Sequence, residues 1–177
     1  MKIRFLLVLV MAICLVSAAS AQTKATGALQ CAKPDPMHMV EVGDKPGHSM
    51  MISKTTCTWS KAMDVGGMAA KDGASTEISE MSGGKSTGNG VHWGTVEGGD
   101  KYYVKYTSSA TYTKEGGLDA VSGTWKYTGG TGKLKGITGK GTYKGKGNAD
   151  GTASFEVEGE YAMPAAKAPA AKAPAKK

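Results

Sequence analysis

Methionine and histidine side chains cluster in the first third of the chain, in a pattern that could bind copper. Six residues form two groups: Met37, His38 and Met39, and then His48, Met50 and Met51. Cu(I) prefers thioether and imidazole ligands, so a barrel rim that presented both groups could hold this ion. Methionine also fills irregular cores, and consecutive residues such as 50 and 51 must face opposite sides of a strand. The sequence therefore favours packing here over a metal site, with Cu(I) binding as an alternative.

The remaining reactive residue types form no catalytic motif. His92 stands beside Trp93 and could act as an acid or base, but no Ser or Cys nucleophile motif accompanies it. Residues 82–87 resemble a phosphate loop, yet Ser79 occupies the place of its first glycine. Nothing in the sequence singles out two carboxylates as a general acid and a general base. The sequence thus indicates no catalytic residue and no cofactor, and it favours a non-enzymatic protein.

The two ends of the chain differ from its body. Lys2 and Arg4 precede an apolar run over residues 5–16 and the cleavage pattern Ala19-Ser20-Ala21. This pattern predicts a helical signal peptide over residues 1–21, with cleavage before Gln22, and its apolar run is too short to anchor the protein across a membrane. We therefore expect an exported protein, either periplasmic or secreted.

The basic character of the chain is located at its ends. The net charge is +7, but the signal peptide holds two cations, and residues 164–177, a repeated Pro-Ala-Ala-Lys-Ala unit, hold four. The remaining residues 22–163 carry a net charge of +1. Repeated proline without large apolar residues predicts a disordered tail, which would contact polyanions weakly or serve as a solubilising tether.

Two cysteines remain after cleavage, Cys31 and Cys57, with 25 residues between them. In an oxidising compartment such a pair favours a disulfide over two buried thiols, and a bridge would add about 3 kcal/mol of stability.

Polar and apolar residues alternate along the body with the period of β-strands, and no apolar helical period of useful length occurs. Eight strands are predicted, over residues 38–42, 49–59, 75–81, 90–97, 102–112, 121–128, 138–146 and 152–161. Turn residues separate them. Glycines on inward faces suit a small closed barrel, so we predict an all-β, antiparallel barrel of about eight strands over residues 37–163, preceded by a lead segment over residues 22–36.

A basic stretch lies near the end of this domain. Residues 120–149 contain six lysines and no acid. If residues 147–151 form the turn, Lys140 lies opposite Glu158 and Lys144 lies diagonal to Glu156, as in ordinary surface pairs. This expected pairing argues against a polyanion-binding face, and because exposed base-stacking aromatics are not evident, we expect no specific nucleic-acid binding by the body.

Residues 128–136, Thr-Gly-Gly-Thr-Gly-Lys-Leu-Lys-Gly, and the following Gly139-Lys-Gly-Thr-Tyr143 resemble a loop and strand of the allene oxide cyclase and dirigent barrels. Residues 36–164 are similar to small exported bacterial proteins with such barrels and no assigned activity. The resemblance implies an eight-stranded antiparallel barrel with an apolar interior. It places no catalytic residue of the cyclases on this sequence.

The preferred hypothesis is a non-enzymatic exported barrel that binds an apolar small molecule or an envelope component. The candidate lining residues are Tyr102, Tyr106, Trp125, Tyr127 and Phe155, which would serve equally well in a solid core. A cyclase- or isomerase-like enzyme and a Cu(I)-binding protein are the alternatives.

Overall fold

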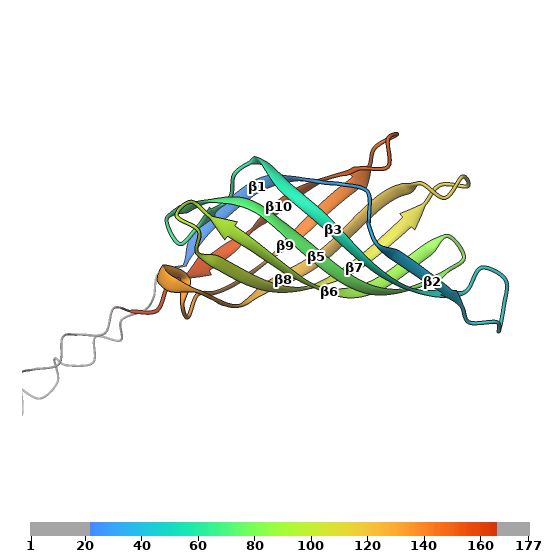
Figure 1. The fold of residues 1–177 in the computed structure, drawn as a ribbon, viewed down its shortest axis with the longest axis horizontal. Coiled ribbons are helices and arrows are strands. Elements are labelled where there is room, and N and C mark those ends of the chain that lie inside the picture. The colour runs from blue at the N-terminus through green and yellow to red at the C-terminus, as the bar shows by residue number, and fades with distance from the viewer. Residues whose placement is uncertain (1–21, 166–177) are drawn as a thin grey trace, which may run out of the picture.

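The computed structural model describes residues 22–165, which form an antiparallel β-barrel (Figure 1). The expected signal peptide and the tail from residue 166 onward lie outside the described residues. The elements are β1 (Thr23–Cys31), β2 (Met37–Glu41), β3 (Ser49–Lys61), β4 (Asp64–Val65), β5 (Met68–Ser82), β6 (Lys85–Val96), β7 (Lys101–Tyr112), β8 (Leu118–Gly130), the 3-10 turn η1 (Gly132–Leu134), β9 (Thr138–Gly147) and β10 (Ala153–Ala162). Within the described range, no helix is long and apolar enough to span a bilayer.

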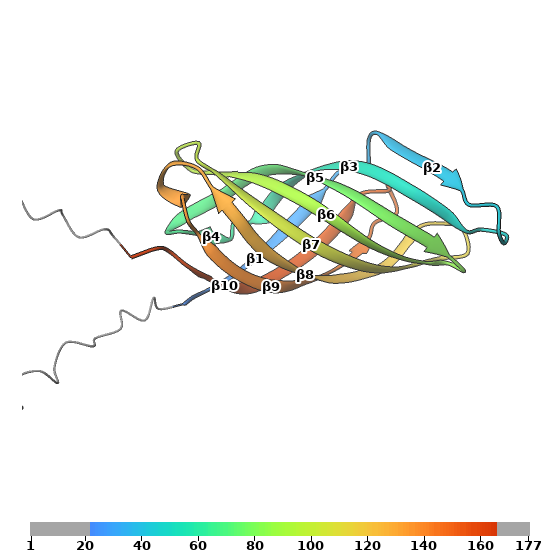
Figure 2. The same ribbon diagram turned by 90° about the horizontal axis from the view of Figure 1, so that it is seen from below.

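Eight strands close the barrel, which confirms the predicted fold class. They follow the order β3-β1-β10-β9-β8-β7-β6-β5, and β5 pairs back onto β3. The first barrel strand is β1, which pairs with both β10 and β3 and lies inside the segment expected to lead into the domain. Strand β2 instead pairs with the first half of β3, beyond the end of β1, and projects beside one end of the barrel (Figure 2).

The pairing of β9 with β10 corrects the expected cross-strand contacts. Lys144 lies directly opposite Glu156, with 3.0 Å between its Nζ and the carboxylate, and Lys140 lies opposite Glu160 rather than Glu158. The turn begins one residue later than expected because the Asn148 backbone N–H donates to the Thr152 carbonyl at 2.8 Å.

The apolar core fills the end of the barrel that carries η1. Leu134 of η1 is fully buried there. Around it pack Ala25, Met63, Val65, Ala70, Val96, Tyr102, Val104, Trp125, Tyr127, Ile137 and Tyr161. Two glycines show why the aromatic rings fit. A Cβ on Gly90 would lie 2.1 Å from Tyr106, and one on Gly94 would lie 2.3 Å from Tyr102, because each ring lies over the glycine opposite it.

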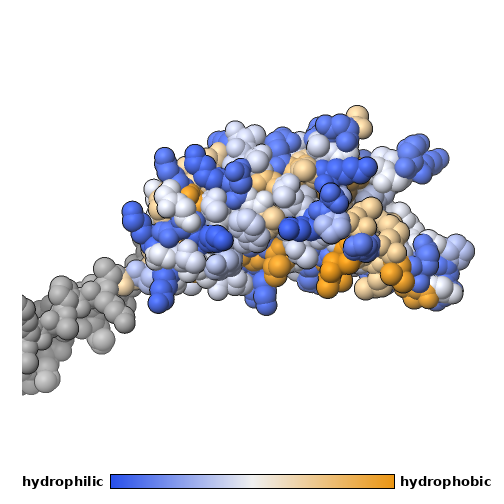
Figure 3. All heavy atoms as spheres, viewed as in Figure 1, coloured by the Kyte–Doolittle hydropathy of each residue, from blue (hydrophilic) through white to orange (hydrophobic). Residues whose placement is uncertain are grey.

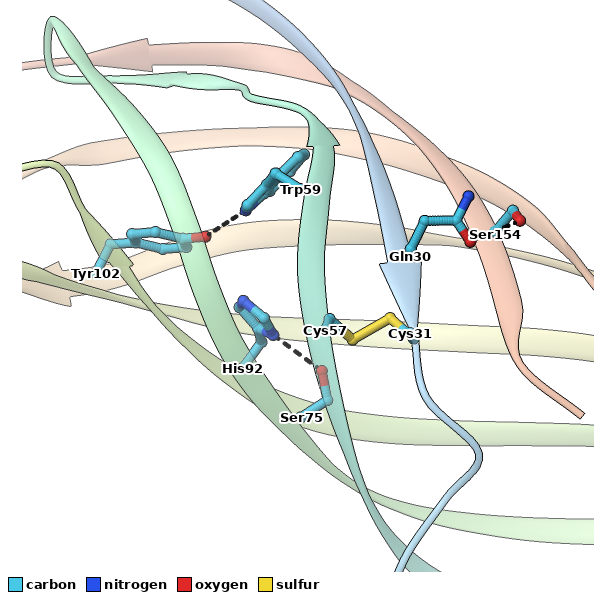
Figure 4. The surroundings of a disulfide bond; sticks show 8 residues. All are labelled: Gln30, Cys31, Cys57, Trp59, Ser75, His92, Tyr102 and Ser154. Atoms are coloured by element: carbon cyan, nitrogen blue, oxygen red, sulfur yellow. Dashed lines mark hydrogen bonds between the residues drawn. A yellow bond between two sulfur atoms is a disulfide. The ribbon is translucent and has the colours of Figure 1, made fainter.

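The predicted disulfide is present between Cys31 and Cys57. The two residues are buried and directly opposite each other on β1 and β3 (Figure 4). Since β1 also pairs with β10, the bridge ties β3 to the other wall of the barrel near the point where β1 ends.

Candidate functional site

The five aromatic residues predicted to line the barrel all lie on its inner face. Tyr102, Trp125 and Tyr127 are buried in the core, and Tyr106 and Phe155 are partly buried. Their rings meet edge to face, with centroids 5.1 Å apart for Trp125 and Tyr127 and 6.0 Å apart for Tyr102 and Tyr127. Such pairs stabilise a packed interior. Their contact with a ligand stays a prediction.

A different part of the barrel departs from the usual distribution of side chains. We call residues 49–54 of β3, 75–81 of β5 and 86–93 of β6 the inverted sector. Apart from Met51 and Met81, its inner face carries small or polar residues: Ser49, Ser53, Ser75, Glu77, Ser79, Ser86, Gly88, Gly90 and His92. Its outer face carries Met50, Ile52, Ile78, Val91 and Trp93. A water-soluble barrel is expected to show the reverse pattern.

Hydrogen bonds join the polar side chains on the inner face. The Glu77 carboxylate accepts a hydrogen bond from the Ser108 hydroxyl at 2.8 Å. Tyr106 lies directly opposite Gly90, and both burial and the neighbouring charge of Glu77 raise the pKa of its phenol. Burial and the same carboxylate also raise the pKa of Tyr143. These groups therefore hold a carboxylate inside the barrel among neutral hydroxyl groups.

His92 and Ser75 form a second polar contact on this face. Their Nδ1 and Oγ atoms lie 2.9 Å apart (Figure 4). A nucleophile and base can have this geometry, but burial lowers the pKa of His92 to about 4. An imidazole with that pKa is a weak general base near neutral pH. The contact therefore serves to pair two buried polar groups.

The outer face of the sector is the most apolar exposed surface among the described residues. We call it the outer patch, and it consists of Val40, Met50, Ile52, Ile78, Val91, Trp93 and Tyr103. Ile52 lies directly opposite Ile78, and Trp93 lies directly opposite Tyr103. Val91, diagonal to Ile78 and two positions before Trp93 on β6, links the two pairs. Apolar side chains gather toward the end where β2 lies (Figure 3). Contiguous patches of this kind mark interaction sites.

A row of lysines borders the outer patch. Val91 lies directly opposite Lys105, Lys105 opposite Lys126, and Lys126 opposite Lys140. None of the three lysines lies within 4 Å of a carboxylate in the part of the chain that the structure describes. They line a hollow of about 940 Å³ together with Lys24, several threonines and two glutamates, Glu158 and Glu160. Like charges placed opposite each other repel, and of the three lysines only Lys140 has a carboxylate residue, Glu160, directly opposite it on a neighbouring strand.

The residues proposed for copper divide between different environments. His38 and Met50 belong to the outer face, while Met37, Met39 and Met51 share the inner face. Both ring nitrogens of His48 contact carboxylates, those of Asp44 and Glu80, which together raise the pKa of this imidazole. The described residues contain no cluster of three His, Cys, Asp or Glu side chains able to hold a metal.

Sequence reasoning missed Glu77, Ser79 and Met81 on the inner face. The sequence did contain a signal for them: in the strand predicted over residues 75–81, residues two positions apart share one face, so Glu77, Ser79 and Met81 lie on the same side. The usual assignment of apolar residues to the interior would place Ile78 inside and Glu77 outside, and the structure shows the opposite. Comparison of the chain with protein-family models and with curated proteins finds no match.

Proposed function

We propose that this protein is a non-enzymatic binding protein whose outer patch docks onto an anionic lipid surface of the cell envelope. The inversion of β3, β5 and β6 is the observation that supports this role. Exposing Ile52, Ile78 and Trp93 to water costs free energy, which burial against acyl chains would recover at about 25 cal/mol per Å². A solid apolar core needs no such surface, since the core of this barrel lies at the other end.

The charges beside the outer patch favour an anionic partner. Lys105 borders Val91, and Lys54 follows Ile52 by two positions on the same face of β3. The opposed lysines 105, 126 and 140 repel one another, and anionic headgroups would relieve this repulsion. Apolar side chains beside a basic row match the acyl chains and headgroups of an anionic lipid.

Two aromatic residues add to this match. Trp93 is 43% exposed, Tyr103 lies directly opposite it, and the Lys101 ammonium lies 5.2 Å from the centre of the Trp93 ring. Tryptophan and tyrosine prefer the boundary between headgroups and acyl chains, where an apolar ring and a polar group are both accommodated.

Vesicle co-flotation tests the proposal. Protein should float with vesicles of phosphatidylglycerol and phosphatidylcholine, and high salt or pure phosphatidylcholine should weaken the binding. Ile78→Asp should abolish flotation, whereas Ser122→Asp, which adds the same charge to the exposed face of β8, should retain most of it. Binding should also shift the emission of Trp93 to shorter wavelength, and a Trp93→Phe variant should lose that shift.

Two outcomes would overturn the proposal. One is equal flotation of the Ile78→Asp and Ser122→Asp variants. The other is a concentration-dependent doubling of the mass that Ile78→Asp abolishes, without any binding to vesicles. In that second case a further copy of the chain covers the outer patch.

Binding of a small molecule inside the barrel is a second candidate function. The Tyr127 hydroxyl is buried without a hydrogen-bond partner among the described residues, so it could donate to a ligand. Tyr102, Tyr106, Trp125, Tyr127 and Phe155 would line such a site. Native mass spectrometry of the protein purified from its own compartment would reveal the ligand as added mass, and an unliganded mass with full stability would oppose this candidate.

The closed barrel is compatible with the resemblance to allene oxide cyclase and dirigent barrels, and we propose membership of that superfamily on the loop and strand over residues 128–143. Cyclase-like activity would then be the enzymatic alternative. We also propose that the protein is exported, which the disulfide supports because such bonds persist in oxidising compartments.

A further inference from the structure

Four methionines lie together on the inner face of the sheet at the end where β2 projects. Met39 of β2 lies directly opposite Met51 of β3, and Met37 is one row away on the same face of β2. On the other side of β3, Met51 lies directly opposite Ser79, and Met81 follows Ser79 by two positions. Residues directly opposite or diagonal to each other are within reach of long side chains. The other three methionines thus lie around Met51, and the four come from three neighbouring strands.

The burial pattern shows which face they occupy. Ser49 and Ser79 are both 2% exposed and alternate with exposed Met50 and Glu80, so odd-numbered residues of β3 and β5 face inward here. Met51 and Met81 are partly buried on this side, while Met37 and Met39 remain about half exposed. An ion could therefore reach the thioethers from solvent.

Packing alone does not explain these four side chains. The methionines that pack in or against the core, Met63, Met68 and Met163, lie toward the other end of the barrel. None of the four inner-face methionines belongs to that core cluster. Half-exposed methionines recover little of the free energy that burial would give.

A buried polar side chain without a hydrogen-bond partner in the described part of the chain lies beside Met51 and Met81. The Ser79 hydroxyl is buried without a hydrogen-bond partner among the described residues, and it lies between Met51 and Met81. A buried unpaired hydroxyl in a folded protein calls for a partner such as a bound water, ion or polar group.

We propose that Met37, Met39, Met51 and Met81 form a binding site for a soft monovalent cation, Cu(I) or Ag(I). Thioether ligands without imidazole or carboxylate favour these ions over Zn²⁺, Cu²⁺ and Mg²⁺. His38 and Met50 are on the outer face, and His48 is held by Asp44 and Glu80, so these three residues take no part. The Cu(I) alternative considered from the sequence is thereby replaced by a different set of ligands.

Nuclear magnetic resonance of protein labelled with ¹³C at the methionine methyl groups tests the site, with Ag(I) as a redox-inert probe. The methyl signals of Met37, Met39, Met51 and Met81 should shift and saturate together. Those of Met50, Met63 and Met68 should stay in place. Shifts confined to Met50, or equal shifts of all methionines, would overturn the proposal, as would the absence of any shift at excess Ag(I).

Competition for Cu(I) against bicinchoninate provides a second test with a matched pair of variants. Met51→Leu should weaken Cu(I) binding at least about tenfold, because one of the ligands is lost. Met50→Leu, on the next residue but the opposite face, should bind as the unaltered protein does. Met39 lies on the peripheral strand β2, so Met39→Leu should weaken Cu(I) binding without disturbing the barrel. This variant provides the test if Met51→Leu misfolds. Equal affinities of the Met39→Leu and Met50→Leu variants would refute the site.

Discussion

Replacing Gly90 with alanine tests whether the aromatic rings are held by the glycines beneath them. The new Cβ would lie 2.1 Å from Cζ and 2.3 Å from the hydroxyl oxygen of Tyr106. Carbon atoms in contact are normally about 3.5–4.0 Å apart, so the ring must move by more than about 1 Å. Tyr143 restricts this movement, because it packs edge to face on Tyr106 with centroids 6.1 Å apart.

The expected loss of stability follows from two opposing effects. Overpacking a well-packed site costs about 1–3 kcal/mol. Replacing glycine by alanine stabilises by about 0.4–1 kcal/mol through the unfolded chain. Gly90→Ala should therefore lower the free energy of unfolding by about 1–2 kcal/mol, and with it the urea midpoint, while the melting temperature should fall by about 2–8 °C.

A double-mutant cycle identifies the ring as the cause. In a Tyr106→Leu background, Gly90→Ala should stabilise by about 0.4–1 kcal/mol, so the coupling energy should equal the overpacking cost of about 1–3 kcal/mol. Gly117→Ala is the control, because its nearest neighbour outside the adjacent residues is the Thr113 hydroxyl at 3.5 Å, and its effect should stay within about 0.5 kcal/mol. The reasoning is refuted if Gly90→Ala is as neutral as this control, or if its cost persists without the tyrosine.

Two further predictions concern the disulfide and the buried histidine. Reduction, or the Cys31→Ser/Cys57→Ser double variant, should lower the free energy of unfolding by about 3 kcal/mol, and an unchanged urea midpoint in reductant would contradict this. The pKa of His92 is about 4 in the folded protein, below its usual value near 6.5, so the unfolded chain binds the proton first. Stability should be unaffected above pH 6.5 and fall by up to about 3 kcal/mol as the pH drops from 6.5 to 4. His92→Asn should flatten this part of the stability curve, and identical curves for the two proteins would rule the explanation out.

Strand period and turn chemistry sufficed to predict the barrel. Strands β7 to β10 alternate regularly between inward aromatic or glycine residues and outward polar ones, and the structure places them close to the predicted ranges. Strand β1 was missed because its inward positions Ala25 and Gly27 are small and give little hydrophobic contrast with Thr26 and Ala28. The strands that pair with β1, namely β10 and β3, are distant from it in sequence, so a local sequence pattern could not reveal the pairing.

The site was harder to predict than the fold, because the faces of β5 depend on one irregularity. Ala70 packs in the core, so an uninterrupted strand would direct the even-numbered residues inward. The pairing of β5 with β6 shifts between Ala70 and Gly73, and a shift of one residue exchanges the two faces of all that follows. Ser75, Glu77 and Ser79 therefore face inward and Ile78 faces outward.

The disulfide independently requires the same orientation. Cys57 must face inward to meet Cys31, so the even-numbered residues of β3, including Ile52, face outward. The pairing of β3 with β5 keeps one register throughout, from Ser49 opposite Met81 to Cys57 opposite Gly73. In this register Ile78 lies directly opposite Ile52. The pairing of β5 with β6 then places Trp93 opposite Ala74, on the same outer face. The disulfide on β3 and the bulge on β5 thus fix the same faces of these strands. This one arrangement produces both the outer patch and the inner methionines. Because the register of whole strands sets which residues face outward, the exposed apolar surface is a feature of the fold itself.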